Sequence, residues 1–232
     1  MSDRPTPATS PEPVPAPQPA PAAPHPHRAE TLRRVAGLAD ATVAIALTFL
    51  VLPLLEVAPE FAETRLGPLL YDHLGELIAF LVSFFAIAAF WRGNRRLFEN
   101  LGDYDDTLVF LTLTWLLVIV FIPFPTAMLP IDGPQTSTTV FYLGTLAVGA
   151  SVAAAQAIYV VAHPGLLHDR ASRSTVLAVA YRALGAVAVF ALAAVVAIAS
   201  AVAGLLVLLL IPLVSVVANR VAARMERTAA QG

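Results

Sequence analysis

The apolar segment from Arg34 to Leu54 limits what this chain can fold into more than any other stretch. At about 1.5 Å per helical residue it is long enough to cross a hydrocarbon core of roughly 30 Å. Asp40 stands inside it, and a carboxylate is costly in lipid unless it is paired or faces water, so Asp40 is a candidate functional residue. Alternatively, Asp40 could cap the helix or pair with Arg33 or Arg34 and contribute only to folding.

The same segment carries an apolar stripe. Ile45, Phe49 and Leu52 follow the i, i+4, i+7 spacing that places side chains on one face of a helix. Every face of a membrane span is apolar, so the same triple could equally be ordinary packing. Pro53 predicts that the helix stops or kinks close to this stripe.

Composition extends the membrane interpretation to the whole chain. The hydrophobic fraction is 58% and the charged fraction only 13%, whereas about a quarter of residues are charged in soluble proteins. We therefore predict an all-α integral membrane protein with about six spans. The predicted spans lie at about 34–54, 72–98, 107–128, 138–162, 175–199 and 203–218. Small residues at 200–204 predict the tight reversal between the last two.

Both ends of the chain differ from the predicted membrane domain, residues 31–223. Residues 1–30 are rich in Pro and Ala, which predicts a disordered N-terminal tail, and residues 224–232 form a short C-terminal tail.

Nearly all arginines fall on the side of the two termini. The positive-inside rule then predicts a multi-pass protein of the cell membrane with both termini cytoplasmic. Asp103, Asp105 and Asp106 precede the third span, where acids favour a helix N-terminus.

Motifs of several functional classes are absent from the sequence. There is no metalloprotease, serine-hydrolase, P-loop or dinucleotide motif, and there are no cysteines. We therefore predict no catalytic residues, no cofactor, no metal site and no nucleic-acid partner. The middle of every predicted span is uncharged, which disfavours a pump or a proton-coupled transporter. The Thr-Val-Gly-Tyr-Gly filter of ordinary potassium channels and an arginine-repeat voltage sensor are also missing.

The remaining chemistry is an apolar bundle with hydroxyl and ring side chains. Such a bundle could conduct only through a pore that is narrowed by apolar side chains, a constriction that can gate by dewetting. One chain of short spans does not enclose such a pore. Conduction would therefore require an oligomer with one helix of each subunit at the axis.

Three stretches resemble a known family. Arg34, Asp40 and residues 41–48 resemble the first-helix signature of the transmembrane protein 175 family, the prokaryotic and endolysosomal potassium channels. Residues 83–91 of the second span and residues 123–126, which close the third, are similar to that family in order and spacing. Beyond about residue 126 the resemblance is one of hydropathy only.

The resemblance implies a homotetramer of six-span subunits in which the first helix lines a potassium-preferring pore without a carbonyl filter. By position, Ile45, Phe49 and Leu52 match the apolar constriction, and Thr48 matches the hydroxyl layer beside it. Potassium would be the permeant ion, and the subunit's partners would be its own copies and the lipid bilayer.

The resemblance also implies that Arg34 and Asp40 belong to a polar network that holds the first helix in place. Some positions depart from the family pattern, namely Leu38, Ala39, Asn94 and Thr112. In addition, Phe49 is bulkier than the leucine that is common at its position. The leading hypothesis is a passive potassium-preferring leak channel; the alternatives are a non-conducting membrane scaffold and a proton pathway or transporter.

Overall fold

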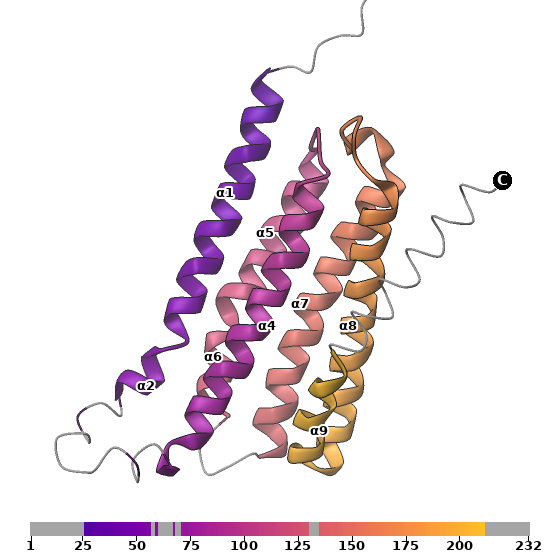
Figure 1. Ribbon diagram of the computed structural model, residues 1–232. Coiled ribbons are helices and arrows are strands. Elements are labelled where there is room, and N and C mark those ends of the chain that lie inside the picture. The colour runs from indigo at the N-terminus through magenta and orange to yellow at the C-terminus, as the bar shows by residue number, and fades with distance from the viewer. Residues whose placement is uncertain (1–25, 57–58, 60–66, 68–70, 130–134, 212–232) are drawn as a thin grey trace, which may run out of the picture.

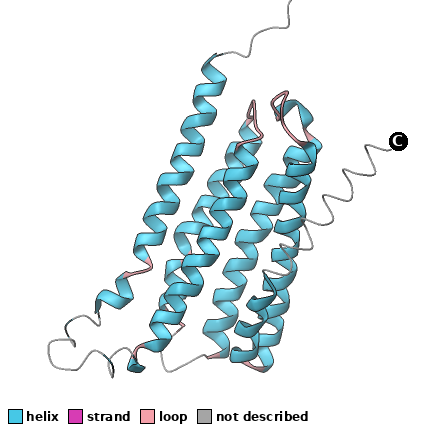
Figure 2. Cartoon of the chain, in the orientation of Figure 1, coloured by secondary structure: helices cyan, strands magenta, loops and turns pink. Residues whose placement is uncertain are grey.

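The computed structural model describes residues 26–56, 59, 67, 71–129 and 135–211, which form a bundle of helices (Figures 1 and 2). Helices long and apolar enough to cross a membrane lie at Glu30–Glu56, Leu74–Phe98, Asp106–Ala127, Thr136–Ala162 and Ser174–Ala199. The prediction of an all-α membrane protein is confirmed, and these five spans correspond to the first five predicted ones. Residues 1–25 and 224–232, most of the predicted tails, lie outside the described residues.

The first span is bent near its end. α1 (Pro26–Phe49) begins eight residues before Arg34, and α2 (Leu52–Glu56) continues the chain in a different direction (Figure 1). Pro53 has no N–H to donate to the carbonyl of Phe49, so the regular helical bonding is interrupted there. The predicted stop or kink at Pro53 is confirmed.

This bend corrects the predicted apolar stripe. The i, i+4, i+7 spacing assumes one continuous helix from Ile45 to Leu52, but Leu52 lies beyond the break and is the first residue of α2. The Val51 amide instead bonds the Thr48 carbonyl at 3.2 Å, a tighter turn than the α-helix uses. Ile45 and Phe49 therefore share a helix face, while the direction of Leu52 is set separately by the turn.

The second and third spans are α4 (Leu74–Phe98), then α5 (Asp106–Phe121) followed by the short α6 (Pro123–Ala127). Asp105 is the N-cap of α5, and its carboxylate accepts a bond from the Leu108 amide at 2.8 Å. The acidic N-terminus predicted for this helix is thereby confirmed.

The second half of the bundle contains α7 (Thr136–Ala162) and α8 (Arg173–Ala199), which pack extensively against each other. The chain reverses at Ser200, whose extended backbone and side-chain bond to the Ala203 amide cap α9 (Ala201–Val207). The predicted break at 200–204 is confirmed. The predicted sixth span, 203–218, begins in α9 and the 3-10 turn η3 (Leu208–Leu210) and then runs beyond the described residues.

The core is formed by α5 and α7 with contributions from α1, α4 and α8. Trp115 of α5 and Tyr142 of α7 are its largest fully buried side chains. At one end of the bundle, the loop after α4 and the loop before α8 pair through Leu101 and Leu167, and the Gly102 amide donates to the Leu166 carbonyl at 2.8 Å. The C-terminal end of α4 and the N-terminal end of α8 are therefore held side by side.

Candidate functional site

The candidate pore helix, α1, has two different faces. Ala39, Val43, Ala46 and Leu50, spaced at i, i+4, i+7 and i+11, are at most 3% exposed and pack into the bundle core. Most of these side chains are small, which lets α1 lie close to α5 and α4. α1 thus meets its own subunit along a narrow seam and leaves the rest of its surface uncovered.

The predicted constriction residues lie on the uncovered surface. The exposed fractions are 53% for Ile45, 47% for Phe49 and 49% for Leu52. These values exclude the interpretation that the three side chains are packed inside this subunit. The exposed Thr48 lies beside them, and its hydroxyl donates to the Ile45 carbonyl at 2.7 Å, which leaves both lone pairs of the hydroxyl oxygen available as acceptors.

The predicted polar residues of α1 have different partners. Arg34 Nε donates to Glu30 Oε1 at 3.3 Å, one helical turn earlier. Asp40 Oδ1 accepts a hydrogen bond of 2.7 Å from Trp91 Nε1 of α4. Asp40 therefore bonds the first helix to the second through Trp91, whereas the ion pair of Arg34 lies within α1.

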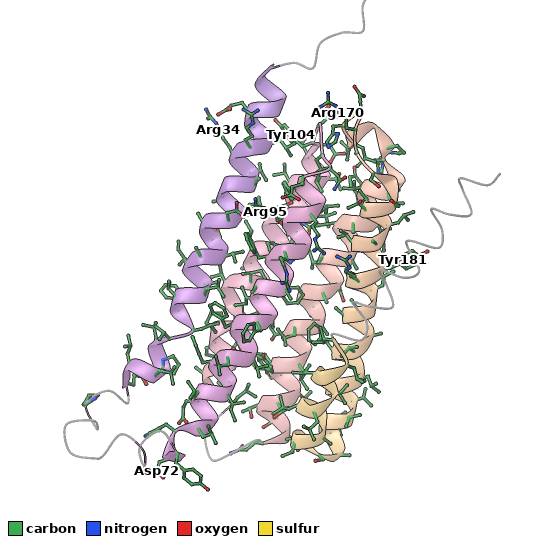
Figure 3. The ribbon with its side chains drawn as sticks, in the orientation of Figure 1. Arg34, Asp72, Arg95, Tyr104, Arg170 and Tyr181 are labelled. Atoms are coloured by element: carbon green, nitrogen blue, oxygen red, sulfur yellow. The ribbon has the colours of Figure 1, made fainter. Side chains whose placement is uncertain are left out.

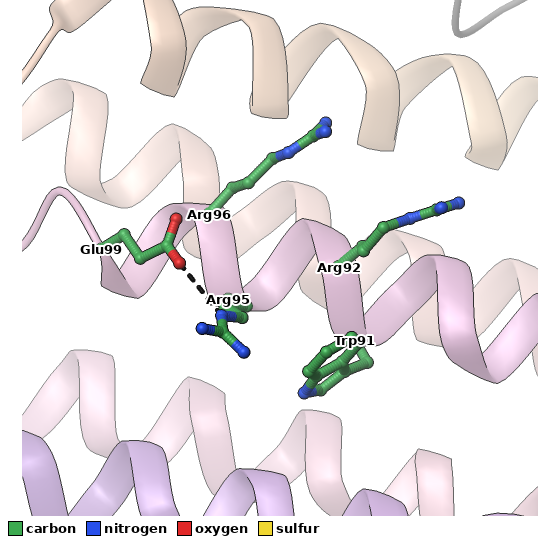
Figure 4. A pocket seen from close by; sticks show the side chains of 5 residues that line it. All are labelled: Trp91, Arg92, Arg95, Arg96 and Glu99. Carbon is green, nitrogen blue, oxygen red and sulfur yellow. Dashed lines mark hydrogen bonds and ion pairs between the residues drawn. The ribbon is translucent and has the colours of Figure 1, made fainter.

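Trp91 is a site residue that sequence reasoning missed. Its position before a run of arginines suggests only an aromatic residue at the membrane interface. In the structure, Trp91 contacts Arg95 as well as Asp40: Arg95 Cζ lies 5.5 Å from the centre of the Trp91 ring. Arg95 Nε in turn donates to Glu99 Oε1 at 3.0 Å. The i, i+4, i+8 spacing of Trp91, Arg95 and Glu99 is the sequence feature that could have revealed one shared face (Figure 4).

The four departures from the family pattern fall in different surroundings. Leu38 is 50% exposed, whereas Ala39 is part of the packed seam. Thr112 is fully buried, accepts a bond of 3.1 Å from Gln156 Nε2 and donates to the Leu108 carbonyl, so it joins α5 to α7. Asn94 is buried in α4, and its Nδ2 has no partner among the described residues.

A buried hydroxyl cluster joins three helices near the other end of the bundle. Ser83 Oγ lies 2.8 Å from Thr126 Oγ1 and 3.0 Å from Tyr142 Oη. These residues come from α4, α6 and α7, and all three are buried. Because each hydroxyl has a partner, the cluster positions α6, and with it the Pro-Phe-Pro-Thr segment at residues 123–126, against α4. Sequence reasoning did not identify this cluster, since its members are far apart along the chain.

Asp105 gives a testable dependence of stability on pH. Partial burial alone would raise its pKa, but hydrogen bonds from Tyr159 Oη and the Leu108 amide hold the pKa of Asp105 below its usual range. A lowered folded-state pKa contributes stability above the unfolded pKa of about 3.9, and this contribution is lost as pH falls through the folded value. Asp105→Asn should therefore lower the unfolding midpoint at pH 7 and cost progressively less below about pH 4.

The pH test is thermal unfolding of the purified protein between pH 7 and pH 3. Asp106→Asn, which removes the same charge from the exposed neighbouring residue, is the matched control for the change in net charge. A constant difference between wild type and Asp105→Asn over the whole range would contradict the ionic role of Asp105.

Comparisons with known proteins agree with this architecture. Residues 34–123 match the model of the endosomal/lysosomal potassium channel TMEM175 family. A potassium channel of Streptomyces collinus is 33% identical over 41% of this chain and 46% of its own length. The endosomal/lysosomal proton channel TMEM175 of Rattus norvegicus is 29% identical over 66% of this chain and 31% of its own length. The chain thus matches less than half the length of these curated relatives.

A solved structure supports the fold. The crystal structure of a lysosomal potassium-selective channel TMEM175 homolog from Chamaesiphon minutus superposes with a TM-score of 0.63 at 22% identity, over 84% of this chain and 98% of the other. These similar proteins are named as ion channels rather than enzymes, in agreement with the prediction from the sequence. Since the family model, the named relatives and the fold agree, the resemblance seen in the first three spans is confirmed: residues 34–123 of this chain match the TMEM175 family model.

Proposed function

We propose that this chain is a subunit of a passive, potassium-preferring cation channel, a homotetramer whose first helix lines the pore without a carbonyl filter. One observation carries the proposal, namely the exposed apolar face of α1 opposite its packed seam. Potassium is proposed as the permeant ion because two bacterial relatives are named potassium channels.

The position of α1 supports a pore at the centre of an oligomer. α1 lies at one edge of the bundle, beyond α4 and α5 (Figure 1). In a symmetric ring of subunits an edge helix can come closest to the axis, and copies of Ile45 and Phe49 would then face one another. Rings of apolar side chains narrow a pore and can gate it by dewetting. Thr48 would add hydroxyl oxygens next to this constriction, and Leu52 would extend it from α2.

The distribution of charge supports an orientation in the cell membrane. Arg34, Arg95 and Arg170 lie toward one end of the bundle, whereas Asp72 lies at the other (Figure 3). The positive-inside rule places the arginine-bearing end, where α1 begins, on the cytoplasmic side. Permeant potassium, the bilayer and further copies of the chain are the proposed partners, and no cofactor is part of the proposal.

Proton conduction is the second candidate, because the rat and human relatives are named proton channels. In that case acidification of vesicles would exceed potassium uptake. A non-conducting scaffold is the third, and it predicts neither flux.

The test is ion flux into proteoliposomes that contain the purified protein, with potassium compared against sodium and protons. Ile45→Asn should increase potassium flux several-fold, because a polar and hydratable side chain replaces an apolar one at the constriction. Leu113→Asn is the matched control, since Leu113 on α5 is 50% exposed and Ile45 53%. This control should leave the flux close to that of wild type.

Each result decides between the candidates. Potassium flux above sodium that Ile45→Asn alone enlarges would support the channel and its α1 pore. Equal increases from Ile45→Asn and Leu113→Asn would refute α1 as the constriction. No flux from correctly inserted oligomers would favour the scaffold, and a purified monomer would rule out the central pore.

A further inference from the structure

Three arginines gather between α4 and α8. Arg92 and Arg96 are one turn apart on α4, and both are exposed. Figure 4 shows that they point to the opposite side of the helix from Trp91 and Arg95, toward the pale orange ribbon that has the colour of α8. Arg182 of α8 is half-buried and lies within electrostatic range of both. Two helices that are distant in sequence thus bring cations together.

Two acidic side chains that contact this part of α4 or belong to it have other partners. Glu99 pairs with Arg95 at 3.0 Å, and Asp40 accepts the bond from Trp91. Within the described part of the chain, the side chains of Arg92 and Arg96 have no ion pair or hydrogen bond. The neighbouring Arg95 is therefore neutralised in the subunit, whereas the two arginines that face α8 are not.

The depth of the cluster indicates where a counter-ion would come from. α4 ends and α8 begins at the same end of the bundle. Arg92 lies six residues before the end of α4, roughly 9 Å along the axis, and Arg182 lies nine residues after the start of α8, roughly 13 Å. Both are inside membrane-spanning helices, at a depth from which an arginine reaches the lipid headgroups. Cations at this depth are costly unless an anion accompanies them.

We propose that Arg92, Arg96 and Arg182 bind the phosphate of an anionic phospholipid headgroup. Planar guanidinium groups donate paired hydrogen bonds to phosphate oxygens, and basic sites between membrane helices are suited to such headgroups. This site is separate from the proposed pore, since α1 lies on the other side of α4, and its binding does not depend on conduction.

The test is native mass spectrometry of the purified full-length protein, titrated with phosphatidylglycerol or phosphatidylcholine of the same acyl chains. Wild type should bind phosphatidylglycerol preferentially. Arg92→Gln/Arg96→Gln should bind it roughly 30-fold more weakly, because two phosphate-binding cations are lost. Arg95→Gln removes one such charge from the same helix on the side of α1, and it should retain the wild-type affinity.

Further variants separate lipid binding from folding and from binding of free anions. Arg92→Lys/Arg96→Lys keeps the charge without the planar fork and should bind with intermediate affinity. If Arg92→Gln/Arg96→Gln did not fold, the Lys variant and Arg182→Gln would be titrated in its place, and both should bind phosphatidylglycerol more weakly than wild type. Inorganic phosphate in the same titration should not compete with the lipid. Competition at similar concentration would instead indicate a site for a soluble anion and overturn the lipid assignment.

Two other outcomes would also refute the site. If phosphatidylglycerol bound no better than phosphatidylcholine, or if Arg95→Gln weakened binding as much as the change at the two α8-facing arginines, the attraction would be unspecific. If the Gln variant kept its lipid but lost its oligomeric state, the arginines would face a neighbouring subunit instead.

Discussion

Replacing Trp115 by alanine is expected to lower the free energy of unfolding by about 3 kcal/mol, because it removes the largest side chain of the core. Trp115 is fully buried in α5 and belongs to the core that α1, α4 and α7 share. Its indole Nε1 has no hydrogen-bond partner among the described residues, so the loss is one of packing. Lipid tails are as apolar as the core, so the cost comes from the cavity and the lost van der Waals contacts.

The measurement is denaturation of the purified protein in mixed micelles, followed by circular dichroism. Phe110→Ala is the matched control, because Phe110 is an aromatic residue of the same helix that is 67% exposed. A surface truncation of this kind should change stability by less than about 0.5 kcal/mol. Equal losses from both variants would show that Trp115 is not the packed centre of the bundle.

Replacing Gly204 by alanine is expected to destabilise the protein by about 2–3 kcal/mol, at the upper part of the range for overpacking. A Cβ atom at Gly204 would lie 2.5 Å from Ala197 Cβ and 2.8 Å from the Ala193 carbonyl oxygen. Because these contacts involve the backbone and the short Ala197 side chain of α8, no flexible group can move away. The reversal between α8 and α9 must open instead.

The control for this prediction is Gly144→Ala in α7. A Cβ at Gly144 would meet no atom within 4 Å, so the substitution should be neutral or stabilising by up to about 1 kcal/mol through helix propensity. Thermal unfolding of wild type, Gly204→Ala and Gly144→Ala shows whether each substitution lowers or raises stability. Destabilisation by both variants, or by neither, would contradict the close contact of α8 and α9.

Several features could be predicted because they depend on local sequence. The four spans after the first are found within a few residues of their predicted positions, since an apolar run of membrane-spanning length is read directly from neighbouring residues. The cap at Asp105, the interruption at Pro53 and the reversal at Ser200 also follow from local chemistry. Even so, the start of α1 at Pro26 lies within the segment predicted as a tail, because helix formation there continues beyond the apolar run.

The sequence by itself determined that the chain is a membrane helix bundle, where the five spans found among the described residues lie, and which family its first three spans resemble. Only the tertiary structure decided which face of α1 is packed, that Asp40 bonds Trp91, and that Ser83, Thr126 and Tyr142 meet. The physical reason is that every face of a membrane helix is apolar, so periodicity does not distinguish the face toward protein from the one toward lipid or a pore. That choice depends on how small and large side chains of distant segments fit together.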